Sequence, residues 1–565
     1  MKILSVYPYT HLSSSCLLID GKIVAASPEE RFNREKMSTK FPIQSAEWCL
    51  SKGNVKWEEL DLIAVPWNPM RNINNVSGRW VNEMYWRGQM LSHVPGQIMR
   101  AMNGPVADKM EINFGKTKIV YYNHHECHAA NAFFLSGFSN SDILSIDGHG
   151  EDETCFIGRG VGKKIFRNKS IDYPHSVGLF YGTFTDYLGF RPDVDEWKVM
   201  ALYSFATKPN KYDKKISSLM KLTEHGFELD LSYFEYYLFD RKPHFYSKKL
   251  IDLLGPARKK DEKFSERHYE IAGAMQRTFA CITEHLMKIT KKISGNNNLV
   301  LSGGAAMNCV FNGHLDDNNI YKNTHISSCP DDSGVAVGAC LLAYYKNTNK
   351  ARKVEETTTS YWGPEYDDKE IEDVLKKFKL NYKKSNNITK EVANYLANGE
   401  LIGWFQGRME FGHRALGNRS ILADPRYEKT KDKVNSAVKY RESYRPFAPS
   451  VLSEKANLIF EMPKNRKVYF MERAYKIKKN WKNKLNAVRH VDDTGRVQTV
   501  EKNVNKKFYL LIEEFEKLTS IPVLLNTSFN LNGEPIVMKP EHAIRTFFTC
   551  GLDKLAIGSF LVSKD

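Results

Sequence analysis

One pattern occurs twice in this chain, and it restricts the possible fold more than any other feature of the sequence. Residues 3–7 read as a strand, and a polar loop and a hairpin centred on Asp20-Gly21 follow them. Residues 143–147 read as a second strand, followed by the polar loop 148–152 and another hairpin flanked by glycines. Ile-Leu-Ser occurs in both strands, and a cysteine lies near the start of both hairpins. We interpret the two stretches as a diverged internal duplication.

Two copies of strand, loop and hairpin, each followed by helices, resemble the actin-like architecture of sugar kinases and heat-shock ATPases. That resemblance implies a nucleotide in the cleft between the two halves. Three glycine-bearing loops, which follow Asp147, Leu301 and Asp332, fit such a cleft. Glycines allow backbone N–H groups to approach an anion closely, so these loops favour phosphate binding.

Length and composition shifts divide the chain. A chain of 565 residues exceeds one hydrophobic core and predicts roughly two to four domains. Residues 346–366 are polar and contain Gly363-Pro364, so we predict a first domain at 1–345, a linker at 346–366 and a second domain at 367–565. The second domain begins with helical periodicity at 367–380 and 389–398 and a strand at 401–405.

The composition is typical of a globular cytoplasmic protein. It has 42% hydrophobic and 26% charged residues, and no run of about 18 apolar residues. The N-terminus lacks the pattern of a signal peptide, and the nine cysteines form no C-x-x-C pair. We therefore expect a cytoplasmic location with unpaired thiols and no membrane association. No feature of the sequence specifies an oligomeric state.

The net charge of +16 bears on partners rather than on fold. It fits phosphorylated small molecules, nucleic acid or acidic glycans. The alternative is a surface of solvated lysines, because stretches such as 208–221 and 466–507 are lysine-rich.

Two histidines have the spacing of metal ligands. His124 and His128 stand four residues apart, so on a helix both imidazoles lie on one face. Asp147 follows at the end of an apolar run. Two imidazoles and a carboxylate suit Fe(II), Mn(II) or Zn(II), and the spacing does not choose among them. The alternative is a helix with solvated histidines and a capping aspartate.

Arginines concentrate in the second domain. They lie in the glycine-containing stretch 406–420 and continue at Arg426, Arg441 and Arg445. Arginine among glycines and small residues suits bidentate binding of phosphate and carboxylate groups. A solvated basic face would more often be lysine-rich, helical and free of glycine, so we favour an anion site.

Taken in order, motifs across nearly the whole chain resemble those of the NodU/CmcH-type O-carbamoyltransferases. The motifs lie at residues 29–32, 124–128, 147–150, 196–200, 302–304, 332–334, 412–420, 445–450 and 526–530. The resemblance implies an α/β and α+β chain, with a duplicated, actin-like Kae-type N-terminal domain and a YrdC-like C-terminal domain. It also implies two chemical steps. The YrdC-like domain makes carbamoyladenylate from ATP and carbamoyl phosphate, and the Kae-type domain transfers the carbamoyl group to an acceptor hydroxyl.

The resemblance also assigns expected roles to residues. Fe(II), or another divalent transition metal, would be held by His124, His128, Asp147 and Asp332. His11 would take the proton of the acceptor. Carbamoyladenylate would contact Gly148, Gly150, Lys198, Ser302, Gly303, Gly304 and Asn308. ATP, accompanied by Mg²⁺, and carbamoyl phosphate would contact Arg414, Arg419, Lys439, Arg441, Arg445, Arg496, Asn526 and Ser528.

The sequence departs from the family pattern at three positions. Leu12 replaces a usual aspartate after His11, Ala201 replaces a usual glycine, and His413 replaces a frequent proline. The first departure affects the acceptor side most, because the orientation of His11 must then come from elsewhere.

Several functions remain open from the sequence. The favoured acceptor is a hydroxyl of a small molecule, sugar or polysaccharide. The charge favours a second acceptor, the hydroxymethyl group of a modified base in DNA such as 5-hydroxymethylcytosine. Threonylcarbamoyl transfer to tRNA fits the second domain less well. A non-catalytic nucleotide-binding scaffold would not need both the histidine and aspartate set and the arginine-rich set. A zinc protease is excluded, because H-E-x-x-H would need histidine where Ala129 stands.

Overall fold

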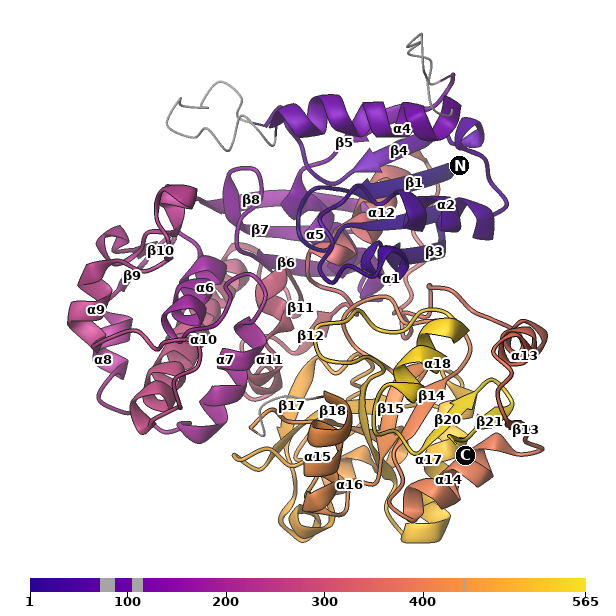
Figure 1. Ribbon diagram of the computed structural model, residues 1–565. Coiled ribbons are helices and arrows are strands. Elements are labelled where there is room, and N and C mark those ends of the chain that lie inside the picture. Colours follow the sequence, from indigo (N-terminus) through magenta and orange to yellow (C-terminus); the bar gives the residue numbers. More distant parts are fainter. Residues whose placement is uncertain (72–86, 104–114, 440–443, 565) are drawn as a thin grey trace. The chain divides into compact units, whose positions relative to one another are not determined.

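The computed structural model describes residues 1–71, 87–103, 115–439 and 444–564, and Figure 1 traces its elements. The chain forms two compact units. Unit 1 contains Met1–Ala25 and Thr39–Thr357, and unit 2 contains Ala26–Ser38 and Thr358–Asp565. The stretch predicted as a linker is thus divided between the units. Its first part packs on unit 1, where the buried guanidinium of Arg352 donates to the carbonyls of Phe133 and Phe138 at 2.7 and 2.8 Å.

Unit 1 contains the same sheet topology twice. The first sheet has the order β3-β2-β1-β4-β5 and the second has β8-β7-β6-β11-β12. β1 pairs antiparallel with β2 and parallel with β4. In the second sheet, β6 likewise pairs antiparallel with β7 and parallel with β11. The predicted duplication is therefore confirmed, and the repeated mixed sheet has the actin-like arrangement. The strands are β1 (Lys2–Tyr7), β2 (Ser14–Ile19), β3 (Lys22–Pro28), β4 (Leu62–Val65), β5 (Lys118–Tyr121), β6 (Asn140–Ile146), β7 (Glu153–Val161), β8 (Lys164–Asp172), β11 (Asn298–Ser302) and β12 (Asn323–Ile326).

Two helices lie between these sheets (Figure 1). α12 (Val335–Asn347) contacts β1 and β2, α5 (His124–Leu135) contacts β6 and β11, and the two helices contact each other. The predicted hairpin turn is present, with φ of 49° at Asp20 and 84° at Gly21, as a type I′ turn requires. The other elements of unit 1 are α2 (Ile43–Lys52), α4 (Val94–Asn103), α6 (Val177–Tyr187), α7 (Glu196–Leu202), α8 (Asp213–Ser217), β9 (Met220–Thr223), β10 (Gly226–Leu229), α9 (Lys248–Leu254), α10 (Glu266–Ser294) and α11 (Cys309–His314).

Unit 2 is built on one mixed sheet with the order β13-β21-β20-β14-β15-β19-β16-β18-β17. Its strands are β13 (Tyr382–Lys384), β14 (Ile402–Phe405), β15 (Arg419–Ala423), β16 (Ala448–Leu452), β17 (Arg473–Lys476), β18 (Thr494–Val500), β19 (Val523–Ser528), β20 (Lys554–Ile557) and β21 (Phe560–Val562). Its helices are α1 (Glu30–Asn33), α13 (Asp368–Lys377), α14 (Ile388–Ala397), α15 (Glu428–Val434), α16 (Ala456–Ile459), α17 (Lys506–Thr519) and α18 (Pro540–Phe548).

The apolar core of unit 2 lies between this sheet and its helices. α14 and α17 lie side by side and contact strands of the sheet, while α18 contacts β14 and β20 (Figure 1). The two helices and the strand that the sequence predicts after residue 366 are present as α13, α14 and β14. Among the described residues, no helix combines the length and apolar character needed to cross a membrane.

Candidate functional site

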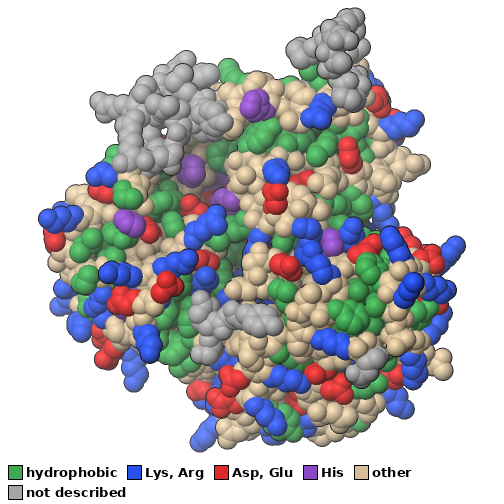
Figure 2. Space-filling view, viewed as in Figure 1, with side chains coloured by type: hydrophobic (Ala, Val, Ile, Leu, Met, Phe, Trp, Pro, Cys, Tyr) green, Lys and Arg blue, Asp and Glu red, His purple; other side chains and the backbone are tan. Residues whose placement is uncertain are grey.

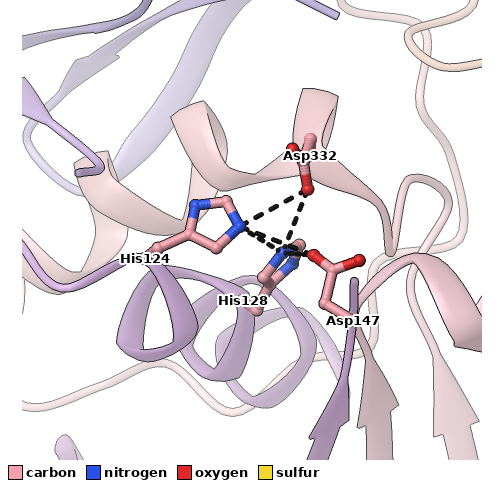
Figure 3. A group of neighbouring side chains, drawn as sticks. All are labelled: His124, His128, Asp147 and Asp332. Carbon is pink, nitrogen blue, oxygen red and sulfur yellow. Dashed lines mark hydrogen bonds and ion pairs between the residues drawn. The ribbon is translucent and has the colours of Figure 1, made fainter. Parts of the chain in front are cut away.

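Four side chains of unit 1 converge on one point (Figure 3). They are His124, His128, Asp147 and Asp332, and all are buried. His128 Nε2 lies 3.0 Å from His124 Nε2 and 2.9 Å from Asp147 Oδ2. Asp332 Oδ1 lies 3.4 Å from both Nε2 atoms. Donors about 2.0–2.2 Å from one metal are about 3.0–3.5 Å apart in octahedral or tetrahedral coordination, so this spacing fits a single ion.

The close packing of α5 and α12 brings these residues together. His124 and His128 lie one turn apart on α5, and Asp332 immediately precedes α12. The two helices approach at Gly338, where an added Cβ would lie 1.9 Å from the carbonyl oxygen of Cys127. Any larger residue at position 338 would separate the helices, so this glycine permits the histidines and Asp332 to meet.

Neighbouring groups orient two of the four donors. His124 Nδ1 lies 3.3 Å from the carbonyl oxygen of Pro66, so this nitrogen carries the proton and Nε2 is left for a metal. The hydroxyl of Tyr7 donates to Asp332 Oδ2 at 2.6 Å and leaves Oδ1 directed at the cluster. The Trp67 ring packs 4.7 Å from the His124 ring, measured between centroids.

Asp147 is held by two of the predicted glycine loops. Its Oδ1 accepts from the backbone N–H groups of Gly148 at 2.8 Å and Gly304 at 3.0 Å, which leaves Oδ2 for a metal. Gly303 has φ of 82°, and an added Cβ would lie 2.1 Å from the carbonyl oxygen of Ile146. The glycines at 148 and 304 therefore bind this carboxylate directly.

Opposite charges shift the pKa values inside the cluster. Burial disfavours ionisation of Asp332, but the imidazole of His124 outweighs it and holds the pKa of Asp332 well below its usual value. Burial likewise lowers the pKa of His124, yet Asp332 and Asp147 raise it well above its ordinary value. A divalent cation would take the place of these imidazole protons, because metal ligands must be neutral imidazole and ionised carboxylate. The two-nitrogen, two-oxygen donor set suits Fe(II), Mn(II) or Zn(II).

His11 lies in the turn between β1 and β2 and is exposed to solvent. Partial desolvation lowers its pKa, but the carboxylates of Asp332 and Asp193 raise it by more. His11 is therefore within electrostatic reach of the four-donor cluster. Leu12, which stands where the family usually has aspartate, is 5% exposed and packs into the core.

Gly150, Ser302 and Asn308 are further residues expected to contact carbamoyladenylate. Gly150 donates to the carbonyl of Glu153 at 2.6 Å, and the hydroxyl of Ser302 is buried without a hydrogen-bond partner among the described residues. Asn308 exchanges hydrogen bonds with the buried Gln276 at 2.9 and 3.1 Å. Its side chain also caps α11. Asn308 is thus already bonded within the fold.

Lys198, on α7, is likewise bonded to protein groups. Its ammonium lies 3.0 Å from Asp195 Oδ1 and over the rings of Phe190 and Trp197. A contact between Lys198 and carbamoyladenylate stays a prediction.

In unit 2, the guanidinium of Arg419 is fully buried and bound by the backbone. It donates to the carbonyls of Gln406 at 2.5 Å and Pro364 at 3.0 Å, and it lies 3.8 Å above the Phe405 ring. Burial lowers its pKa to about 10. These contacts give Arg419 a role in holding the strand ends, and a phosphate contact for it stays a prediction.

Lys439 is surrounded by oxygen atoms of one loop. Its ammonium lies 2.6 Å from the carbonyl oxygen of Ser528, and 2.9 Å from both the carbonyl oxygen and Oδ1 of Asn530. The Ser528 hydroxyl donates to Asn530 Oδ1 at 2.6 Å. The predicted residues Lys439 and Ser528 are therefore neighbours, joined by Asn530.

Asn526 lies within a buried polar network on the sheet. Its amide donates to Ala415 O at 3.1 Å, to Ser450 Oγ at 3.0 Å and to Gln498 Oε1 at 3.1 Å. Gln498 in turn donates to Leu416 O at 3.0 Å. Asn526 is therefore buried beneath the loop that follows Arg414 and holds that loop in place.

The other arginines expected to contact ATP and carbamoyl phosphate all belong to unit 2. Arg414 and Arg445 are half-buried in loops, and Arg496 is half-buried on β18. Arg441 lies outside the described residues. Glu410 is a further residue of this region that the sequence did not predict. Its buried Oε1 accepts from the N–H groups of Leu416, Asn418 and Arg419 at 2.8, 2.7 and 3.2 Å. A lone carboxylate between two arginines in this stretch was the available signal.

Comparisons with known proteins give a consistent result. A family model described as "Carbamoyltransferase N-terminus" matches residues 2–341, and one described as "Carbamoyltransferase C-terminus" matches residues 393–564. The "Uncharacterized protein sll1178" of Synechocystis is 35% identical over 607 residues, covering 100% of this chain and 96% of that protein. Nodulation protein NolNO of Sinorhizobium fredii is 35% identical over 571 residues, covering 98% and 79%. Nodulation protein NolO of Bradyrhizobium diazoefficiens is 38% identical over 453 residues, covering 78% and 79%.

The actin-like unit with its buried histidine and aspartate cluster, and the two matches along the chain, define an enzyme that transfers carbamoyl groups. The chain belongs to the carbamoyltransferase family, and the resemblance to the NodU/CmcH-type enzymes is confirmed.

Proposed function

We propose that the protein is a two-step, ATP-dependent O-carbamoyltransferase whose acceptor is a hydroxyl of a small molecule, sugar or polysaccharide. Unit 2, as a YrdC-like half, makes carbamoyladenylate, and unit 1 transfers its carbamoyl group. One observation carries this proposal. The four-donor cluster lies in unit 1, and a separate set of arginines and Lys439 lies in unit 2.

In the first step, ATP, carbamoyl phosphate and water give carbamoyladenylate, pyrophosphate and phosphate. Water releases phosphate from carbamoyl phosphate, and the resulting carbamate oxygen attacks the α-phosphorus of Mg²⁺-bound ATP. Half-buried guanidinium groups such as Arg414, Arg445 and Arg496 would offset the charge that develops on the leaving pyrophosphate.

In the second step, the acceptor oxygen bonds to the carbamoyl carbon while the bond to the adenylate oxygen breaks and AMP leaves. His11 takes the hydroxyl proton, a role that an exposed imidazole near carboxylates can perform. The four donors would hold a divalent metal, which would supply Lewis acidity for the transfer. Gly148 and Gly304 keep Asp147 oriented throughout.

Release of pyrophosphate without any acceptor tests the proposal. The protein with ATP, Mg²⁺ and carbamoyl phosphate should release pyrophosphate, and absence of that release from folded, metal-loaded protein would exclude the two-step reaction. His124→Ala should spare this release and abolish transfer, whereas Arg414→Ala should reduce the release itself. Loss of both steps in His124→Ala would contradict separate sites. Replacement of the exposed His225 by alanine is the control.

A second candidate acceptor is the hydroxymethyl group of a base in DNA, for which the net charge of +16 is the motivation. Figure 2 shows lysine and arginine interspersed with aspartate and glutamate on the visible face, rather than a continuous basic surface. DNA binding that falls steeply with rising salt would favour this acceptor, and absence of binding at low salt would exclude it.

A further inference from the structure

A short segment near the N-terminus folds with unit 2. Residues 26–38, which we call the strap, group with unit 2, although residues 26–28 are also the last residues of β3. The residues on either side of the strap belong to unit 1. The strap contains α1 (Glu30–Asn33), which ends at Arg34 in the left-handed conformation with φ of 62°. The chain therefore passes between the two units at both ends of the strap, as well as after Thr357.

Three side chains of the strap are packed or buried in the fold. Phe32 packs against the buried side chains of Met409, Ile536 and Met538. Arg31 is 2% exposed and Glu30 is 5% exposed. The packing of Phe32 accordingly connects the strap to unit 2.

Arg31 holds the loop that carries Arg414. Its Nη1 forms an ion pair with Glu30, and its Nη2 donates to the carbonyl of Gly412 at 2.9 Å. The other carboxylate oxygen of Glu30 accepts from the N–H of Met37 at 2.7 Å, so a hydrogen bond joins the two ends of this part of the strap. Arg31 thus connects the strap to the backbone two residues before Arg414.

Arg34 holds the second loop. Its two terminal nitrogens donate to the successive carbonyls of Pro535 and Ile536, both at 2.7 Å. The same loop is braced by Asn530, whose amide donates to the carbonyl of Glu534 at 2.7 Å and whose oxygens accept from Lys439. Arg34 therefore fixes the segment that supports the Lys439 and Ser528 cluster.

Stability alone does not explain a buried arginine, Arg31, and a half-buried one, Arg34, in the strap. Removing charged groups from water is costly, and well-packed apolar residues often stabilise a fold equally or better. A guanidinium, in contrast, can hold two carbonyls in a fixed geometry through its planar fork. The contacts of Arg31 and Arg34 end on two loops that carry residues expected to contact ATP and carbamoyl phosphate.

We propose that Arg31 and Arg34 are positioning residues of the adenylate-forming site, through which the strap clamps the 410–419 and 528–536 loops. This inference rests on the proposed function, because it assigns that site to unit 2. As positioning residues, Arg31 and Arg34 act without touching substrate. Each acts by holding backbone whose neighbours contact the phosphates.

The test uses full-length Arg31→Gln, Arg34→Gln and Arg34→Lys. Initial rates of acceptor-free pyrophosphate release are measured against ATP and carbamoyl phosphate. We expect KM for at least one substrate to rise about 10-fold in each variant, equivalent to about 1.4 kcal/mol. Arg34→Lys should remain impaired, because an ammonium lacks the planar fork that spans both carbonyls. Full rescue by lysine would overturn the clamp in favour of a purely electrostatic role.

Hydrogen exchange of the same proteins gives a readout that does not depend on activity. Amides of residues 410–419 and 528–536 should exchange faster in the variants, while those of α10 should be unchanged. The control is Arg159→Gln, which replaces an exposed arginine on β7 of unit 1. Unchanged exchange in both loops, or wild-type KM values, would overturn the inference. Absence of pyrophosphate release from the wild type would instead exclude the proposed function, and the exchange data would still test the clamp.

Discussion

The backbone N–H of Gly304 donates to Oδ1 of Asp147 at 3.0 Å, although 157 residues separate the two in the chain. This bond joins the loop after β11 to the loop after β6, which are neighbouring parallel strands of one sheet. Because parallel strands end at the same edge, the glycine loop orients a carboxylate of the four-donor cluster. The relationship explains why glycines follow both strands.

Gly304→Ala should weaken metal binding. An added Cβ would lie 2.8 Å from Asp147 Oδ1, so the carboxylate must move. Loss of an orienting contact of this kind typically costs 10- to 100-fold in metal affinity, and we expect about 10-fold. Competition with a metal-binding dye measures the change. Gly96→Ala is the control, since among the described residues no atom beyond its own helix backbone and chain neighbours lies within 4 Å of the added Cβ. Equal affinities for the two variants would contradict the prediction.

His124→Ala and His128→Ala should lose the bound metal. Each removes one of the four donors, and wild-type protein should hold about one transition metal per chain. Elemental analysis of purified protein by mass spectrometry measures the content. His225→Ala, at an exposed position, should retain it. Full metal content in His124→Ala would show that the cluster is not the binding site.

Tyr7→Phe should reduce metal affinity without affecting the fold. The substitution removes only the hydroxyl that donates to Asp332 Oδ2 at 2.6 Å, and the ring still fills its buried position. We expect a loss of about 10-fold, as for other groups that orient ligands. The same dye competition measures it, with circular dichroism as the check on folding. Wild-type affinity would mean that Asp332 is oriented without this hydroxyl.

Asn526→Ala should destabilise unit 2. It leaves the carbonyl of Ala415 without this donor, while Ser450 Oγ still donates to Gln498 Oε1 at 2.6 Å. A buried polar group left unpaired costs about 1–3 kcal/mol, and we expect a loss of that size in the free energy of unfolding. Urea denaturation followed by fluorescence measures this. Asn323→Ala, at an exposed position on β12, is the control, and a similar midpoint for both would contradict the network's importance.

Unit 2 should lose stability in mild acid because of His542. Burial, followed by the nearby cations Arg34 and Lys539, lowers the pKa of His542 to about 3. In the unfolded chain its pKa is about 6.5, so the unfolded state takes up a proton that the folded state does not. The free energy of unfolding is therefore unaffected by His542 above pH 6.5 and decreases as the pH falls from 6.5 toward 3.

At pH 5 this difference amounts to about 2 kcal/mol. Urea midpoints measured at pH 7 and pH 5 should therefore differ less in His542→Gln than in the wild type. The exposed His225→Gln should behave like the wild type. Equal pH dependence in His542→Gln and the wild type would show that another group causes the acid sensitivity.

The sequence by itself determined the architecture of unit 1. The repeated strand, loop and hairpin, with Asp20-Gly21 at the turn, are local patterns that depend on hydrophobic alternation and turn chemistry. The sequence also placed His124 and His128 on one helical face, because a spacing of four residues has a fixed meaning on a helix. The ordered motifs identified the family.

Only the tertiary structure decided which polar groups act together. His125 stands between the ligands in sequence, yet it bonds Ser145 Oγ at 3.1 Å and faces away from the cluster. The sequence also did not predict the contacts of Arg419, Asn308 and Lys198 with protein atoms. Nor did it predict that residues 26–38 belong to unit 2. Helix periodicity and turn signals arise from neighbours in sequence. Contacts such as Arg31 with Gly412 join residues 381 positions apart, and only packing of the whole chain brings them together.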